Sequence, residues 1–82
     1  MFIVYVLYSE LFKKIYIGFT TNLEQRLLSH NELATKGWTI KFRPWKLIHK
    51  EFFEDKQSSM HREKELKSAK GREWIWQLVE KM

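Results

Sequence analysis

With 82 residues, the chain is long enough for one domain with a modest hydrophobic core, spanning residues 1–82, and too short for two. A hydrophobic content of 44% excludes a disordered segment, and the lack of cysteine excludes disulfides and thiolate zinc sites. The net charge of +5 favours a polyanionic partner, either nucleic acid or an anionic membrane surface.

The first predicted element is a strand over Phe2–Tyr8. It is rich in β-branched and aromatic residues and has apolar side chains at both alternating positions, which is typical of a central strand buried on both faces. The run is far shorter than the roughly 20 residues that span a bilayer, and it has no basic leader. We therefore expect no membrane anchor or targeting segment, and a cytoplasmic location.

A hairpin and a helix are predicted next. The polar interruption Ser9–Lys13 has the length of a hairpin turn, so Lys14–Phe19 is expected to pair antiparallel with the first strand. Thr21 and Glu24 have the spacing of a capping box, which predicts a helix that begins there and runs to about residue 33. Leucines one turn apart give this helix an apolar face.

The remaining segments complete an α/β protein of the α+β type. Residues 34–43, which contain Gly37 and Trp38, are predicted to be a loop with an exposed basic rim, followed by a third strand over 45–53. Asp55 is the predicted N-cap of a helix over 56–70 that ends at Gly71. A short helix over 72–81 is expected to bury Trp74, Ile75, Leu78 and Val79. The order β-β-α-β-α-α predicts a small, mostly antiparallel three-stranded sheet flanked by helices.

Four polar residues are expected around one crevice at the start of the chain. Tyr16 and Gly18 share one face of their strand, and Arg26 and His30 stack one turn apart at the border of the helix's apolar face. A hydroxyl, a guanidinium and an imidazole together suit a phosphate and a proton transfer beside it. Each residue also has a structural interpretation, as a core tyrosine, a snorkelling arginine or a partly exposed histidine.

Glu63 is a candidate of a different kind. It lies three residues from both Met60 and Leu66, so it is centred on the predicted packing face of its helix. A carboxylate at such a position needs a cation or hydrogen-bond donors. A structural salt bridge to a lysine or to Arg26 is the alternative to a functional role.

Together these residues resemble the GIY-YIG nuclease superfamily, in particular its small stand-alone, UPF0213-like bacterial members, and the N-terminal nuclease domain of bacterial excinuclease. The second motif is intact as Tyr16-Ile17-Gly18, and the first appears as Ile3-Val4-Tyr5, with its tyrosine 11 residues before Tyr16. The family's helix arginine and histidine match Arg26 and His30, and its acidic metal ligand matches Glu63. Phe19 stands where some repair-nuclease relatives carry lysine.

This resemblance implies phosphodiester hydrolysis with one Mg²⁺ or Mn²⁺ ion held by Glu63. In that scheme Arg26 stabilises the charge on the phosphate, and Tyr16 orients or deprotonates the attacking water. His30 is the alternative base or a relay, and Tyr5 holds the network in place.

The expected function is that of a metal-dependent endonuclease acting on DNA, including branched or damaged DNA, in repair or recombination. A protein partner could direct it to its target. The candidate nucleic-acid-binding residues are Gly18, Asn31, Lys13, Lys14, Lys36, Lys41 and Arg43. Two alternatives stay open: an inactive nucleic-acid-binding or adaptor module, and a protein-interaction domain anchored by Trp38 and Trp45.

Overall fold

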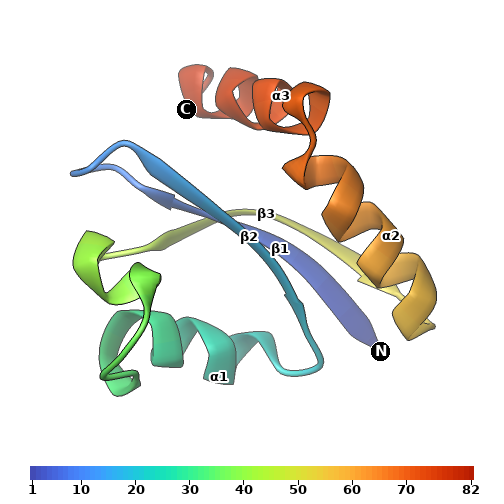
Figure 1. The fold of residues 1–82 in the computed structure, drawn as a ribbon, viewed down its shortest axis with the longest axis horizontal. Helices are drawn as coiled ribbons and strands as arrows, with labels where there is room; N and C mark the ends of the chain where they lie inside the picture. The colour runs from blue at the N-terminus through green and yellow to red at the C-terminus, as the bar shows by residue number, and fades with distance from the viewer.

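The structure is a computed structural model that describes residues 1–82, and it contains one antiparallel sheet with helices on both faces (Figure 1). Three strands, β1 (Phe2–Ser9), β2 (Lys14–Thr20) and β3 (Lys46–Phe53), are arranged in the order β2-β1-β3. The predicted α+β fold, the hairpin and the central position of the first strand are therefore confirmed.

Strand β1 divides its side chains between two hydrophobic clusters, one on each face of the sheet. Val4, Val6 and Tyr8 pack with residues of the two C-terminal helices, whereas Tyr5 and Leu7 pack on the opposite face. Because successive side chains of a strand point to opposite faces, the apolar residues at every position from Phe2 to Tyr8 give β1 two packed faces, and the strand is buried from Val4 onward. A register shift between Val6 and Leu7 introduces a bulge in the pairing with β3.

On one face lie α1 (Leu23–Leu28), a π-helical turn η1 (Ser29–Leu33) and a 3-10 helix η2 (Trp38–Phe42). The predicted capping box is wrong, because Asn22 caps α1 by accepting a hydrogen bond from the Gln25 N–H at 3.1 Å. Asparagine in an extended conformation is one of the best N-cap residues. The predicted loop over 34–43 is also wrong in part, since it contains η2.

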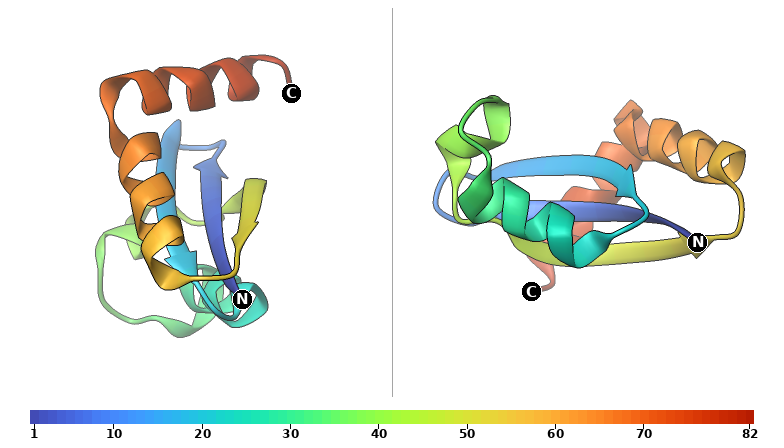
Figure 2. Two further views of the ribbon diagram at one scale, coloured as in Figure 1. Left: turned by 90° about the vertical axis from the view of Figure 1, so that its right-hand side faces the viewer. Right: turned by 90° about the horizontal axis from the view of Figure 1, so that it is seen from below.

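On the other face lie α2 (Lys56–Lys67) and α3 (Ala69–Glu80), with Asp55 as the predicted N-cap of α2 (Figure 2). The boundary between them is not at Gly71, as predicted, but at Ser68, whose Oγ accepts a hydrogen bond from the Gly71 N–H. Gly71 lies in the first turn of α3, where a Cβ would collide with the backbone of Glu65 and Leu66. Glycine here permits close approach of the two helices, rather than ending α2.

The predicted burial of the C-terminal helices needs two corrections. On α2, Ser59 and Leu66 are fully buried and Met60 is exposed, so the packing face is rotated toward Ser59. On α3, Ile75 is fully buried, whereas Trp74 is 37% exposed. None of the helices combines the length and the apolar composition needed to cross a membrane.

Candidate active site

Tyr5 and Gly18 face each other across the β1–β2 pair, on the face of the sheet covered by α1. A Cβ on Gly18 would lie 2.7 Å from the Tyr5 Oη and 2.9 Å from its Cζ. Both distances are shorter than real Cβ contacts, so any other residue at position 18 would displace the Tyr5 phenol. The glycine of the second motif therefore makes room for the tyrosine of the first.

A buried chain of hydrogen bonds runs from Tyr5 through His30 to Thr39. The Tyr5 Oη lies 3.0 Å from His30 Nε2, and His30 Nδ1 lies 3.1 Å from Thr39 Oγ1. The Trp45 Nε1–H donates to the Thr39 carbonyl at 2.8 Å and fixes η2 against β3. Thr39 was missed in the sequence because it lies in the predicted loop, and no local pattern marks a threonine whose partner is nine residues away.

The protonation states of Tyr5 and His30 follow from their surroundings. Burial raises the pKa of Tyr5 to about 12, with the nearby Arg26 guanidinium partly opposing this shift. Burial, together with the positive charges of Arg26 and Arg43, lowers the pKa of His30 below its ordinary value. We therefore assign a neutral phenol that donates to Nε2 of a neutral imidazole, whose Nδ1–H donates to Thr39.

Tyr16 differs from Tyr5 in that its hydroxyl has no hydrogen-bond partner within the protein. Its ring is packed 4.8 Å from that of His30 and 6.2 Å from that of Tyr5, centroid to centroid. The side chain is only partly buried and lines a cavity of about 300 Å³ together with Trp38 and Lys67. Of the two motif tyrosines, only Tyr16 is thus free to contact a molecule in this cavity.

Arg26 and Glu63 reach the tyrosines from opposite layers of the fold. Arg26, on α1, and Glu63, on α2, both contribute to the electrostatic environment of the Tyr5 phenol, with opposite effects on its pKa. The Glu63 carboxylate is 20% exposed and pairs with Lys67, whose Nζ lies 3.6 Å from Oε1. Because Lys67 lines the same cavity as Tyr16, the structure brings Tyr16 and Glu63 to one region of the surface.

A family model described as the GIY-YIG catalytic domain matches residues 1–76. The chain belongs to the GIY-YIG family. The GIY-YIG family is one of nucleases, and nucleases of this family generally use divalent metals. No solved structure gives a significant match to the chain.

Relatives of this GIY-YIG domain are found in bacteria and archaea. A UPF0213 protein of Staphylococcus haemolyticus is 39% identical over 54 residues, 66% of this chain and 66% of the relative. A UPF0213 protein of Natronomonas pharaonis is 40% identical over 54 residues, 66% of this chain and 64% of the relative. One of Bacillus velezensis is 38% identical over 64 residues, 74% of this chain and 65% of the relative. The chain thus spans slightly less than two thirds of these relatives' own length.

The donor set of this GIY-YIG domain suits a hydrated Mg²⁺ ion rather than an all-protein metal cage. No group of three or more acidic or histidine side chains is close enough to hold a metal ion. Mg²⁺ keeps several waters and is often bound by one or two carboxylates together with substrate phosphates. Glu63 provides one such carboxylate, paired with Lys67, which lines the Tyr16 cavity.

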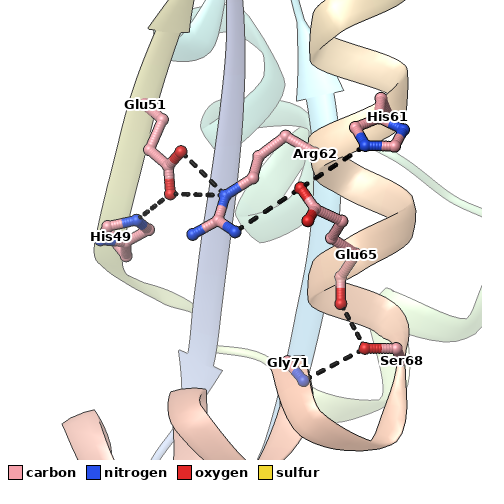
Figure 3. Close-up of polar contacts among 7 residues, drawn as sticks. All are labelled: His49, Glu51, His61, Arg62, Glu65, Ser68 and Gly71. Atoms are coloured by element: carbon pink, nitrogen blue, oxygen red, sulfur yellow. Dashed lines mark hydrogen bonds and ion pairs between the residues drawn. The ribbon is translucent and has the colours of Figure 1, made fainter.

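A second polar cluster connects α2 with β3 (Figure 3). The Arg62 Nε–H donates to both carboxylate oxygens of Glu51 on β3, at 2.9 and 3.1 Å, and His49 pairs with the same carboxylate at 2.7 Å. Burial opposes ionisation of Glu51, but the hydrogen bonds from Arg62 and His49 lower its pKa overall. These contacts tie α2 to β3, and the neighbouring Glu63 is about 100° further around the helix.

The seven predicted nucleic-acid-binding residues fall into distinct structural settings. Asn31 pairs through its amide with the backbone of Trp45, and Arg43 donates to the carbonyls of Ser29, His30 and Ala34. Both therefore stabilise the layer containing α1. Gly18 makes room for Tyr5. The exposed lysines of the set are Lys13 and Lys14 in the hairpin, and Lys36 and Lys41 beside and within η2.

The neutral state of His30 makes the stability of the fold depend on pH. The folded chain binds fewer protons at His30 than the unfolded chain, so the free energy of unfolding is expected to fall as pH drops below about 6.5. The slope for one proton is at most about 1.4 kcal/mol per pH unit. Urea unfolding between pH 7 and 5 measures it.

A matched pair of variants tests whether His30 is the group responsible for this pH dependence. His30→Gln is expected to flatten it, whereas His61→Gln, at a site whose side chain is 76% exposed, should leave it unchanged. An equally steep slope in His30→Gln would show that another group binds the proton. The lowered pKa of Glu51 changes the free energy of unfolding only at more acidic pH, from the ordinary pKa of a glutamate downward.

Proposed function

We propose that this GIY-YIG domain is an endonuclease that hydrolyses phosphodiester bonds in DNA with the help of Mg²⁺ or Mn²⁺. The observation that carries the proposal is the contrast between the two motif tyrosines. Tyr5 is buried and hydrogen-bonded to His30, whereas the Tyr16 hydroxyl is unbonded and lines a cavity together with Lys67, the ion-pair partner of Glu63. Lys67 thus links the cavity of the free hydroxyl to the candidate metal ligand.

In this proposal Tyr16 Oη receives the hydrogen bond, and then the proton, of the water that attacks phosphorus. This role requires the phenolate form of Tyr16, which gives its own proton to solvent before it accepts the proton of the water. Lys67 places a positive charge at the same cavity, and Arg26 adds one beside the Tyr5 phenol. In this proposal His30 is not the base, because both of its ring nitrogens are engaged by Tyr5 and Thr39, and it holds Tyr5 in position.

Arg26 and Glu63 act on the phosphate. The Arg26 guanidinium can donate to the non-bridging oxygens, where negative charge develops during the reaction. Glu63 would hold the divalent cation, which when bound polarises the phosphate and stabilises the departing oxygen. The ion pair with Lys67 competes with cation binding, so Lys67 must move from Glu63 before or during occupation of this site.

The proposal is tested by incubating supercoiled plasmid DNA with the purified chain. Nicking is expected with Mg²⁺ or Mn²⁺, loss of nicking with excess EDTA, and recovery when Mg²⁺ is restored. Arg26→Ala, purified in the same way, is expected to nick about 10²–10³-fold more slowly, which excludes a contaminating nuclease. Binding without cleavage under any divalent metal would instead favour an inactive nucleic-acid-binding module. Preferential cutting of branched or damaged DNA would support a role in repair or recombination.

A further inference from the structure

The cavity beside Tyr16 lies at the free edge of the sheet. It has a volume of about 300 Å³ and is lined by Ile15, Tyr16, Ile17, Trp38, Lys67 and Arg72. Three consecutive β2 residues line it because β2 is an edge strand, so the cavity extends from the η2 side of the sheet to the α2–α3 side. It therefore combines aromatic groups from one layer with cationic groups from the other.

Trp38 is a rigid aromatic surface at one end of this cavity. Its ring is stacked on Tyr16 at an interplanar angle of 28° and is also packed 4.6 Å from Phe42 and 5.8 Å from Trp45, centroid to centroid. Despite these three aromatic neighbours, Trp38 remains 47% exposed, whereas Trp45 is only 5% exposed. Trp45 is therefore a core residue, and the protein-interaction hypothesis loses one of its two anchors.

Two cations line the other end. Lys67 extends from the last turn of α2 and Arg72 from the first turn of α3. Lys67 pairs with Glu63, while Arg72 takes part in none of the ion pairs of the protein. The close packing of Gly71 against α2 fixes the start of α3, and with it the backbone of Arg72, relative to Lys67.

We propose that this cavity binds one unpaired nucleotide of the substrate, with its base stacked on Trp38 and its phosphate contacted by Lys67 and Arg72. This inference rests on the proposed nuclease function and names its substrate class, which is nucleic acid with at least one unpaired nucleotide beside the scissile phosphate. The bases of an intact duplex are covered by their neighbours, and removing one from the stack has a free-energy cost. Single strands offer bases that can stack on aromatic side chains without this cost.

The chemistry of the cavity favours a nucleotide over an apolar peptide. Besides two isoleucines, its lining contains two aromatic rings and two cations but no carboxylate, and Lys67 is paired with Glu63. Flat rings next to positive charge match a base next to its phosphate. The net charge of +5 adds long-range attraction for the same class of ligand.

The test compares the binding of two fluorescently labelled DNA oligonucleotides, one single-stranded and one blunt duplex of the same sequence. Fluorescence anisotropy is measured in EDTA, so that no cleavage occurs. The wild-type chain is expected to bind the single strand more tightly. Trp38→Ala should weaken single-strand binding by about 10-fold with little effect on duplex binding, and Trp38→Phe should restore most of the loss.

Trp74→Ala is the matched control, because Trp74 is also partly exposed but contacts His49 and Arg62, away from the cavity. It is expected to leave the preference for single strands unchanged. Arg72→Gln should weaken binding to both oligonucleotides and make the salt dependence shallower by about one phosphate contact. Thermal unfolding of each variant verifies that it is folded.

The inference is overturned if Trp38→Ala binds both oligonucleotides like the wild type, or loses affinity for both to the same degree. Absence of binding to either DNA at low salt overturns it as well. Cleavage with Mg²⁺ is scored separately from this assay. A chain that shows the Trp38-dependent preference but never cuts would contradict the proposed function alone, and a chain that cuts without this preference would contradict the nucleotide site alone.

Discussion

Tyr16→Phe is expected to reduce the rate of DNA cleavage by about 10²–10⁴-fold, the range typical of a lost general base. The substitution removes only a hydroxyl that makes no hydrogen bond within the protein, and it keeps the ring that packs on His30 and Trp38. The thermal unfolding midpoint should therefore stay within a few degrees of the wild type. Single-turnover cleavage of a labelled oligonucleotide measures the rate.

Tyr5→Phe is the informative comparison, because it removes a hydroxyl of the same kind from a buried position. It leaves His30 Nε2 without its donor, so a loss of roughly 1–3 kcal/mol in the free energy of unfolding is expected. Any effect on cleavage should then follow the displaced His30 rather than a lost base. If Tyr16→Phe retained a wild-type rate, Tyr16 could not be the base, and the contrast between the two tyrosines would have no catalytic meaning.

Glu63→Gln is expected to lower metal-dependent cleavage by at least about 10³-fold. The amide has nearly the same shape but lacks the charge needed to hold a divalent cation, whose contribution to the transition state is several kcal/mol. Loss of the carboxylate also frees Lys67, so binding of DNA in EDTA should be maintained or strengthened. Cleavage rates measured over a titration of Mg²⁺ should show no saturable stimulation.

Glu65→Gln provides the control on the same helix. Its carboxylate is about half exposed and pairs with His61 and with Arg62, the residue that contacts Glu51 of β3 (Figure 3). The same change in charge at this position should leave the Mg²⁺ titration like that of the wild type. Equal effects of the two substitutions would show that net charge, rather than a carboxylate beside Tyr16, controls the reaction.

The strands, and the placement of Tyr16, follow from patterns within single segments. Alternation alone places Tyr16 and Gly18 on one face of β2 and Ile15 and Ile17 on the other, and the two hydrophobic clusters confirm this division. Likewise, the unbroken apolar run Phe2–Tyr8 predicts the central place of β1 in the sheet. Such features depend only on the pattern of apolar residues along one strand, so they can be recognised without knowledge of tertiary contacts.

The wrong or missed predictions concern positions where two neighbouring residues could play the same role, or where the contacting residue is distant in the sequence. Thr21 and Asn22 could each cap α1, and the choice between them depends on backbone angles that the sequence does not encode visibly. Ser68 and Gly71 could both mark the end of α2, and the close contact between α2 and α3 decides between them. Thr39 is identified only by its long-range contact with His30.

The placement of Arg26 and Glu63 on opposite sides of the sheet makes the proposed catalysis dependent on both halves of the fold at once. Tyr5 and Tyr16 come from the sheet, whereas Arg26 and Glu63 come from layers that pack against it through separate hydrophobic clusters. Local opening of either layer is therefore expected to abolish the proposed nuclease activity well before the whole chain unfolds. In such an arrangement enzymatic activity is a more sensitive indicator of structural integrity than the overall content of helix and strand.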